Sequence, residues 1–110
     1  MNNEPVITIV GNIGKPPDLR YAPNGNAVLT FSMALYTGGS KDKGYKESVW
    51  VRVTAWEELA ETMNEVLDKG MRVRVAGIPQ PPRTYDKDGE KVSAGLEVTA
   101  QTIEVVTREN

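Results

Sequence analysis

Hydrophobic and polar residues alternate over much of this chain, and a period of two is the pattern of a β-strand with one buried face. The clearest case is "AVLTFSMALY" (Ala27–Tyr36), where one face carries Leu29, Phe31, Met33 and Leu35. "MRVRVAG" (Met71–Gly77) alternates in the same way, with arginines opposite valines. We predict a strand over each of these two segments.

Three further segments complete the strands that the pattern predicts. "VITIVGNI" (Val6–Ile13) is rich in β-branched residues, and we expect its strand to end near Gly14, before the turn-rich residues 15–25. "RTYDKDGEKV" (Arg83–Val92) contains Asp-Gly, a strong tight-turn signal, and predicts a hairpin tip. "LEVTAQTIEVV" (Leu96–Val106) predicts a last strand with a slip of period near Gln101–Thr102.

The segment "VWVRVTAW" (Val49–Trp56) has two faces of different chemistry. One face consists of small apolar side chains: Val49, Val51, Val53 and Ala55. The other face consists of two indoles, a cation and a hydroxyl: Trp50, Arg52, Thr54 and Trp56. We expect the first face to join the core and the second to face solvent.

The next segment, "EELAETMNEVLDKG", changes to a helical period. Its apolar stripe is Leu59, Ala60, Met63, Val66 and Leu67. Glutamates crowd the first turns, and Gly70 stands where a left-handed C-terminal cap is expected. We therefore predict one helix between the third and fourth strands.

Five strands with one helix between strands 3 and 4 form the layout of an OB-fold, a small all-β barrel. The chain has 110 residues, which is the size of one domain. We expect this domain to occupy residues 1–106 and residues 107–110 to form a short disordered end.

Composition excludes several kinds of site. The chain has no cysteine and no histidine, so it has neither a disulfide framework nor the usual zinc ligands and general base. We expect no cofactor, no metal and no small-molecule substrate. No segment resembles a signal peptide or a membrane span, and we therefore expect a cytoplasmic protein with no membrane partner.

The net charge is −2, but the charges are unevenly distributed. Five of the 15 acidic residues fall within residues 57–68, which contain no Lys or Arg. The rest of the chain is net basic, and binding depends on local potential. A polyanionic partner is therefore compatible with the net charge of −2.

The outward face of Val49–Trp56 suggests binding of single-stranded nucleic acid. Aromatic side chains stack on unpaired bases with little sequence preference, and cations neutralise phosphates. The expected stacking residues are Trp50, Trp56 and Tyr85, with Tyr36 and Tyr45 as additional candidates. The expected phosphate contacts are Arg52, Arg72, Arg74, Arg83, Lys41, Lys43, Lys46 and Lys87.

Other interpretations of the same residues stay open at this point. Exposed tryptophans also occur under loops and at subunit interfaces, so a protein-interaction module is an alternative. Paired carboxylates such as Glu57 and Glu61 would suit a Mg²⁺-dependent nuclease, although helix solubility explains them more simply. "VGNIG" (10–14) is not a dinucleotide fingerprint, because its spacing differs and two prolines follow it.

The chain resembles the bacterial single-stranded DNA-binding proteins. The matching pieces run nearly end to end, and they include "VGNIG" (10–14), "PDLRYAPNG" (17–25), "WVRV" (50–53), "VAG" (75–77) and "TYDKDGEK" (84–91). The resemblance implies a non-enzymatic OB-fold subunit, usually a homotetramer, that coats exposed strands in DNA replication, recombination and repair. It implies stacking at Trp50, Trp56 and Tyr85, and phosphate or base contacts at Arg52 and Arg83.

The chain departs from this family at three places. Gly38-Gly39 stand where relatives carry another stacking aromatic, which Tyr36 or Tyr45 would replace. Prolines interrupt "GIPQPPR" (Gly77–Arg83), where relatives continue a strand, so we expect weakened pairing there. The sequence stops at "VVTREN" (105–110), before the acidic tail that relatives carry, so we expect either that a native tail was removed or that this is a tail-less form such as a phage or accessory version. We therefore expect the protein to be located at the bacterial nucleoid or in a phage-infected cell. The alternative function is that of an accessory, primosomal-type protein that acts mainly through protein–protein contacts.

Overall fold

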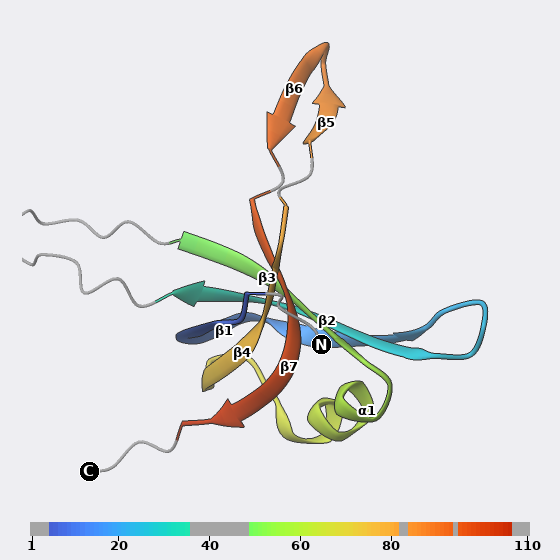
Figure 1. The fold of residues 1–110 in the computed structure, drawn as a ribbon, viewed down its shortest axis with the longest axis vertical. Helices are drawn as coiled ribbons and strands as arrows, with labels where there is room; N and C mark the ends of the chain where they lie inside the picture. Colours follow the sequence, from blue (N-terminus) through green and yellow to red (C-terminus); the bar gives the residue numbers. More distant parts are fainter. Residues whose placement is uncertain (1–4, 36–48, 82–83, 94, 107–110) are drawn as a thin grey trace, which may run out of the picture.

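The computed structural model describes residues 5–35, 49–81, 84–93 and 95–106, which form a closed barrel of five strands. The barrel strands are β1 (Ile7–Tyr21), β2 (Ala27–Leu35), β3 (Val49–Trp56), β4 (Arg72–Gln80) and β7 (Leu96–Val105). Their order around the barrel is β1-β2-β3-β7-β4 (Figure 1). Among the strands that the structure describes, only β3 and β7 pair in parallel. The all-β OB-fold predicted from the order of elements is confirmed.

Strand β1 is longer than the sequence pattern predicts. It does not end near Gly14 but continues to Tyr21, through the segment expected to be turns. The pairing with β2 shifts register between Ile13 and Lys15 and again between Lys15 and Asp18. These β-bulges accommodate Gly14 and the two prolines, because a bulged residue need not donate to the ladder. The prediction of a loop here was therefore wrong.

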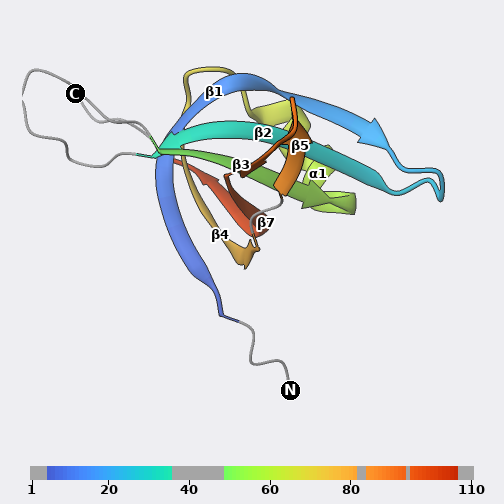
Figure 2. The same cartoon turned by 90° about the horizontal axis from the view of Figure 1, so that it is seen from above.

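The turn between β1 and β2 fixes how the two strands align. The Gly25 N–H donates to the Ala22 carbonyl at 2.8 Å, and Gly25 has a φ of +92°, which favours glycine. The Asn26 N–H also donates to the Asn24 side-chain oxygen at 3.0 Å. The part of residues 15–25 that does form a turn is therefore the Asn24-Gly25 segment. Figure 2 shows this hairpin extending beyond the end of β3, with β1, β2 and β3 side by side.

The core is made by the inward faces of the five strands. Its fully buried side chains include Leu29, Met33, Val51, Val53, Val73, Val75 and Val98. Val49 is the exception to the predicted pattern, because it is 45% exposed at the start of β3. A strand's inward face is buried only where the barrel extends over it, and sequence alternation does not reveal where the barrel ends.

Helix α1 (Glu57–Val66) follows β3 directly and packs on the barrel with Ala60 fully buried. Two details differ from prediction. Val66 is 43% exposed rather than packed, and the helix ends before Leu67, whose extended backbone brings its side chain into the core. Gly70 has the expected left-handed φ of +89°, but it lies in the turn after the helix, where its N–H donates to the Ile13 carbonyl.

Strands β5 (Thr84–Lys87) and β6 (Glu90–Ser93) form a separate two-stranded sheet that projects from the barrel (Figure 1). Asp88 and Gly89 connect them with φ values of 54° and 83°, the left-handed conformation that an Asp-Gly hairpin turn requires. The predicted hairpin is confirmed. Strand β4 keeps Pro79 paired with Val98 but ends at Gln80, directly before Pro81.

Strand β7 contains the slip of period that the sequence predicts. Ala76 of β4 pairs with Thr102 and its neighbour Gly77 pairs with Ala100, so Gln101 is the extra, bulged residue. The bulge lets Ala100 and Ile103 both face the core, although they are an odd number of positions, three, apart in the sequence.

Candidate nucleic-acid interface

Four rows of residues cross β1, β2 and β3 on the outside of the barrel, and we call this surface the outer β1–β3 face. In antiparallel sheets, residues paired in register lie side by side and point to the same face. The rows, each from β1 through β2 to β3, are Asn12–Ala34–Trp50, Lys15–Ser32–Arg52, Asp18–Thr30–Thr54 and Arg20–Val28–Trp56. The two indoles thus stand at opposite ends of a face that carries three cations.

Trp50 lies open to solvent at one end of this face, with 53% of its surface exposed. Its six-membered ring rests against the bulge of β1 at Gly14, where a Cβ atom would stand only 2.5 Å from the ring's Cη2. The absence of a side chain at Gly14 therefore makes room for the ring. One side of the indole is supported by backbone, and the remainder is free to contact a ligand.

Trp56 marks the other end, where β3 meets α1. It is 44% exposed and is the extended residue that precedes the helix. Glu57 follows with a φ of 59°, so the chain turns sharply after the indole. Trp56 lies six positions after Trp50, which corresponds to about 20 Å along a strand. This spacing leaves room for several stacked or bridging nucleotides between the two rings.

Arg52 lies between the two tryptophans and is exposed. It lines a depression of about 440 Å³ together with Lys15 and Arg20 of β1. Sequence alternation missed these two β1 cations, because the region around them was expected to be turns. Gly14 and the Pro16-Pro17 pair are the signal that would have revealed them, since both are suited to bulges within a continuing strand.

Arg72 and Arg74 are placed on β4, which joins the outer β1–β3 face through the first half of β1. Arg72 pairs in register with Asn12, which extends the row of Trp50 by one strand. Arg74 lies two pairs further along β4, opposite Val10, and its guanidinium donates to the Glu104 carboxylate at 3.2 Å. Both arginines are exposed. Arg72 is the one that shares a row with Trp50, whereas Arg74 has an acidic partner.

The other predicted site residues are only partly placed. Tyr85 and Lys87 lie on β5, where Tyr85 pairs with Val92, and only their backbone is described. Tyr36, Lys41, Lys43, Tyr45, Lys46 and Arg83 lie outside the described residues. Their roles stay predictions.

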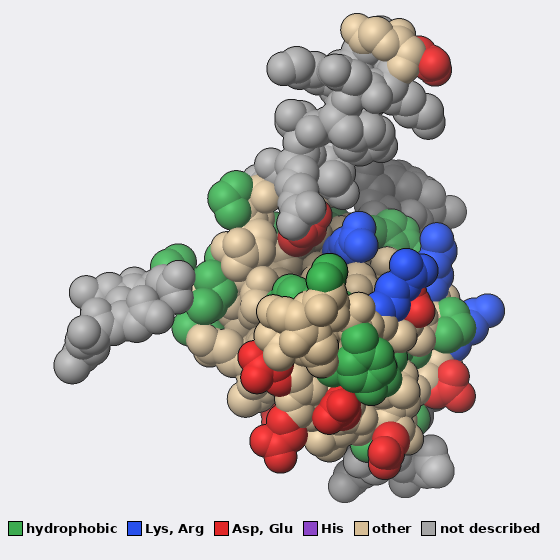
Figure 3. Space-filling view, turned by 90° about the vertical axis from the view of Figure 1, so that its right-hand side faces the viewer, with side chains coloured by type: hydrophobic (Ala, Val, Ile, Leu, Met, Phe, Trp, Pro, Cys, Tyr) green, Lys and Arg blue, Asp and Glu red, His purple; other side chains and the backbone are tan. Residues whose placement is uncertain are grey.

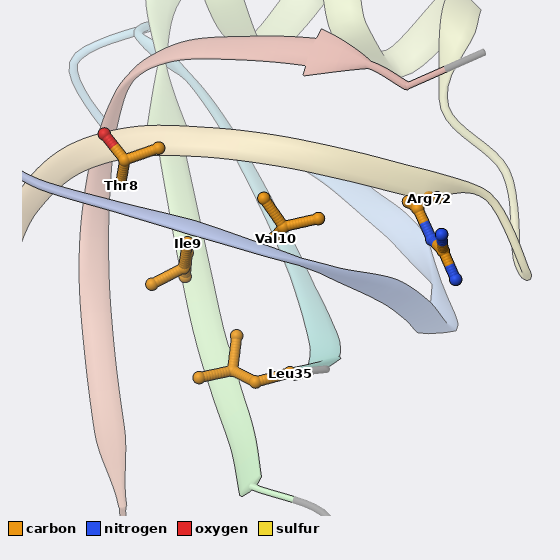
Figure 4. Close-up of a pocket in the computed structure, with 5 residues that line it drawn as sticks. All are labelled: Thr8, Ile9, Val10, Leu35 and Arg72. Carbon is orange, nitrogen blue, oxygen red and sulfur yellow. The ribbon is translucent and has the colours of Figure 1, made fainter. Parts of the chain in front are cut away.

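A second depression, of about 300 Å³, has a different chemistry. It is lined by Thr8, Ile9, Val10, Leu35 and Arg72, which Figure 4 shows along the first half of β1. Its lining is mainly aliphatic and includes no aromatic ring. The surface suited to nucleobases is therefore the one that carries the tryptophans.

Charge is segregated on the side of the molecule seen in Figure 3. Lys and Arg side chains gather to the right of the centre of this view, and acidic side chains dominate below them. Helix α1 and the turn after it expose Glu57, Glu58, Glu61, Glu65 and Asp68. The Tyr21 hydroxyl donates to Glu61 at 3.3 Å, so one glutamate of the pair considered for Mg²⁺ is engaged with β1. A polyanion would be repelled from the helix and attracted to the outer β1–β3 face.

The described residues hold neither a metal-binding cluster nor a membrane-spanning helix. These residues contain no cluster of three or more acidic side chains that would hold a metal ion. Over the same ranges, no helix has the length and apolar character needed to cross a membrane.

Comparison with known proteins assigns the family. The model of the single-strand binding protein family matches residues 5–106. The chain belongs to this family. Single-stranded DNA-binding protein 2 of Listeria monocytogenes is 33% identical over 104 residues, which cover 94% of this chain and 64% of that protein. Single-stranded DNA-binding protein A of Bacillus subtilis is 31% identical, with 94% and 60% covered. The chain thus spans less than two thirds of the length of these curated members.

The family's fold is also found among solved structures. The crystal structure of the small single-stranded DNA-binding protein from Streptomyces coelicolor superposes with a TM-score of 0.79 at 25% identity. The match covers 96% of both chains, so the similarity extends over the whole barrel.

Proposed function

We propose that this protein binds single-stranded DNA with little sequence preference, without enzymatic activity. Bases stack on Trp50 and Trp56, and Arg52 between them neutralises backbone phosphate. The observation that carries the proposal is the pair of indoles, 53% and 44% exposed, at the two ends of one strand with a cation between them. Family membership and the names of the curated relatives support it.

The chemistry of this face favours unpaired strands over duplex. Stacking on an aromatic side chain contributes about 1–3 kcal/mol per base, and it needs a base whose flat face is accessible. A duplex hides these faces between neighbouring base pairs. Two exposed indoles therefore favour single strands, and stacking tolerates any sequence because every base has a flat face.

A fluorescence titration with oligo-dT tests the proposal. Both tryptophans of the chain lie on the proposed site, so base stacking is expected to quench most of the emission. Affinity is expected to fall as salt rises, because each neutralised phosphate releases counterions. A duplex of the same length and charge is the control, and it should quench weakly. Unchanged tryptophan emission on addition of oligo-dT at low salt would contradict the proposal.

The biological role that follows is protection of exposed strands during DNA replication, recombination and repair. The family resemblance also suggests assembly into a homo-oligomer, a tetramer or a dimer. Light scattering of the free protein measures its assembled mass. Titrating oligo-dT into a sample of known mass then gives the number of nucleotides bound by each subunit.

A further inference from the structure

Lys15 and Arg20 of β1, which the sequence pattern did not select, converge with Arg52 on one depression of the outer β1–β3 face. The depression has a volume of about 440 Å³. Besides these three cations, its polar lining consists of two hydroxyl side chains, Thr30 and Ser32 of β2, and one carboxylate, Asp18; Pro16 and Phe31 complete the lining. Cations and hydroxyl donors around a shared hollow are the groups that bind phosphate oxygens.

The register of the sheet explains how the three cations meet. Lys15 pairs with Ser32, which pairs on its other side with Arg52, so the three occupy one row. Strands in a sheet lie about 4.8 Å apart, so Lys15 and Arg52 stand about 10 Å from each other across β2. Arg20 occupies the row of Trp56, at the far side of the depression. The hollow therefore lies beside the line that joins the two indoles.

The acidic neighbours leave these cations with free donors. Asp18 accepts one hydrogen bond from the Arg20 Nε at 2.8 Å, and both side chains are largely exposed. Within the described part of the chain, the terminal nitrogens of Arg20 have no other partner. Arg52 likewise forms no ion pair with any described residue, although Glu97 is its neighbour on β7. The depression thus holds three positive charges against one carboxylate.

We propose that this depression is a backbone-phosphate subsite, in which Lys15 and Arg20 bind phosphodiester oxygens together with Arg52. Thr30 and Ser32 lie on its floor as hydroxyl donors. The inference rests on the proposed binding of single strands, and it adds the path of the strand. The bases between Trp50 and Trp56 lie along β3, and their phosphates turn toward β1. Asp18 orients the Arg20 guanidinium through its hydrogen bond to Nε. The same carboxylate also repels the phosphates and so weakens their binding.

The salt dependence of binding tests the subsite. Lys15→Gln combined with Arg20→Gln is compared with the unaltered protein by titration with oligo-dT over a range of salt concentrations. Each lost phosphate contact reduces the slope of log affinity against log salt by about 0.7 for single strands, so the double variant should lose about 1.4. At 50 mM salt, that change lowers affinity by about tenfold or more.

Lys69→Gln is the control, because it removes one positive charge from an exposed lysine in the turn after α1 that does not line the depression. Its slope should stay as in the unaltered protein. If the double variant keeps its slope while oligo-dT still quenches tryptophan, the subsite is wrong and the proposed function stands. If the unaltered protein neither binds nor quenches, both proposals are overturned.

A variant that should bind more tightly gives a further test, because misfolding would lower the affinity and not raise it. Asp18→Asn keeps an oxygen that accepts from the Arg20 Nε and removes the negative charge. With a phosphate in the depression, this variant should bind oligo-dT about two- to threefold more tightly at low salt. It should also bind an abasic deoxyribose-phosphate oligomer more tightly, since the gain does not involve bases. Unchanged or weaker binding of both probes would contradict the subsite.

Discussion

The six-membered ring of Trp50 lies against the backbone of Gly14, at a position where any Cβ would overlap the ring's Cζ3 and Cη2 atoms. Gly14 is the residue of the first β1 bulge, and its φ does not require glycine. The need for glycine at this position therefore comes from the neighbouring indole and not from the backbone.

Gly14→Ala is predicted to weaken binding while leaving the fold intact. The added methyl meets only the far end of a movable side chain, so Trp50 should rotate and the stability change should stay within about 0.5 kcal/mol. Displacing the ring from its stacking position should reduce affinity for oligo-dT by up to about tenfold, near the lower end of the energy of one stacked base. Fluorescence titration and thermal unfolding measure the two effects.

A double-mutant cycle identifies the cause of this loss. If Gly14 acts through the indole, adding Gly14→Ala to Trp50→Ala should have no further effect on affinity. Additive losses would show instead that the methyl group disturbs another part of the face.

Gly77→Ala is predicted to have the opposite profile. A Cβ at Gly77 would press on the Thr99 carbonyl oxygen and lie 2.9 Å from the Ala100 Cα, at the β7 bulge. These are backbone atoms in a closed barrel, which cannot move without straining their neighbours. We expect a loss of about 1–3 kcal/mol in the free energy of unfolding, measured by urea denaturation. A stability equal to that of Gly14→Ala would contradict this account of the bulge.

Sequence alternation predicted the fold where strands are regular and failed where bulges reset the period. In β2, β3 and β4 it separated the buried from the exposed face almost residue by residue. In β1 the outward residues are Asn12, Lys15, Asp18 and Arg20, whose spacing is irregular because two bulges intervene. Glycine and proline, which enable those bulges, are also turn residues, so the sequence pattern predicts a loop for this segment. The same pattern therefore excludes Lys15 and Arg20 from the predicted binding face.

The candidate site depends on register, which the sequence does not contain. Alternation selected Trp50, Arg52 and Trp56 from one strand alone. Their neighbours follow from the turn at residues 22–26 and the two bulges, which together align Arg20 with Trp56 and Lys15 with Arg52. The slip at Gln101 was visible in advance, because the apolar positions Val98, Ala100 and Ile103 break the period without any turn residue between them.

Trp56→Ala separates DNA binding from subunit contact. If Trp56 stacks a base, the variant should lose about 1–3 kcal/mol of binding free energy and keep its assembled mass. Light scattering and oligo-dT titration measure the two quantities. Tyr21→Ala is the aromatic control, because Tyr21 is 60% exposed, donates to Glu61 of α1 and belongs to none of the four rows of the outer β1–β3 face. A changed mass with unchanged affinity would favour the accessory, protein-interaction alternative.

Glu104→Gln tests whether Arg74 contacts the strand. The Arg74–Glu104 pair is 49% and 65% exposed, so its removal should change stability by less than about 1 kcal/mol. The substitution keeps the length of the side chain and removes the charge that competes with phosphate for the guanidinium. If Arg74 neutralises phosphate, affinity for oligo-dT should rise about two- to threefold at low salt, and the gain should vanish at high salt.

Glu61→Gln is the control for this prediction, because it removes the same charge from an exposed glutamate on α1. General electrostatics would raise affinity by a similar small factor in both variants, whereas a local contact raises it only in Glu104→Gln. Equal gains would place Arg74 off the path of the strand. The β4 side would then contribute through Arg72, which lies in the same row as Trp50 and Asn12.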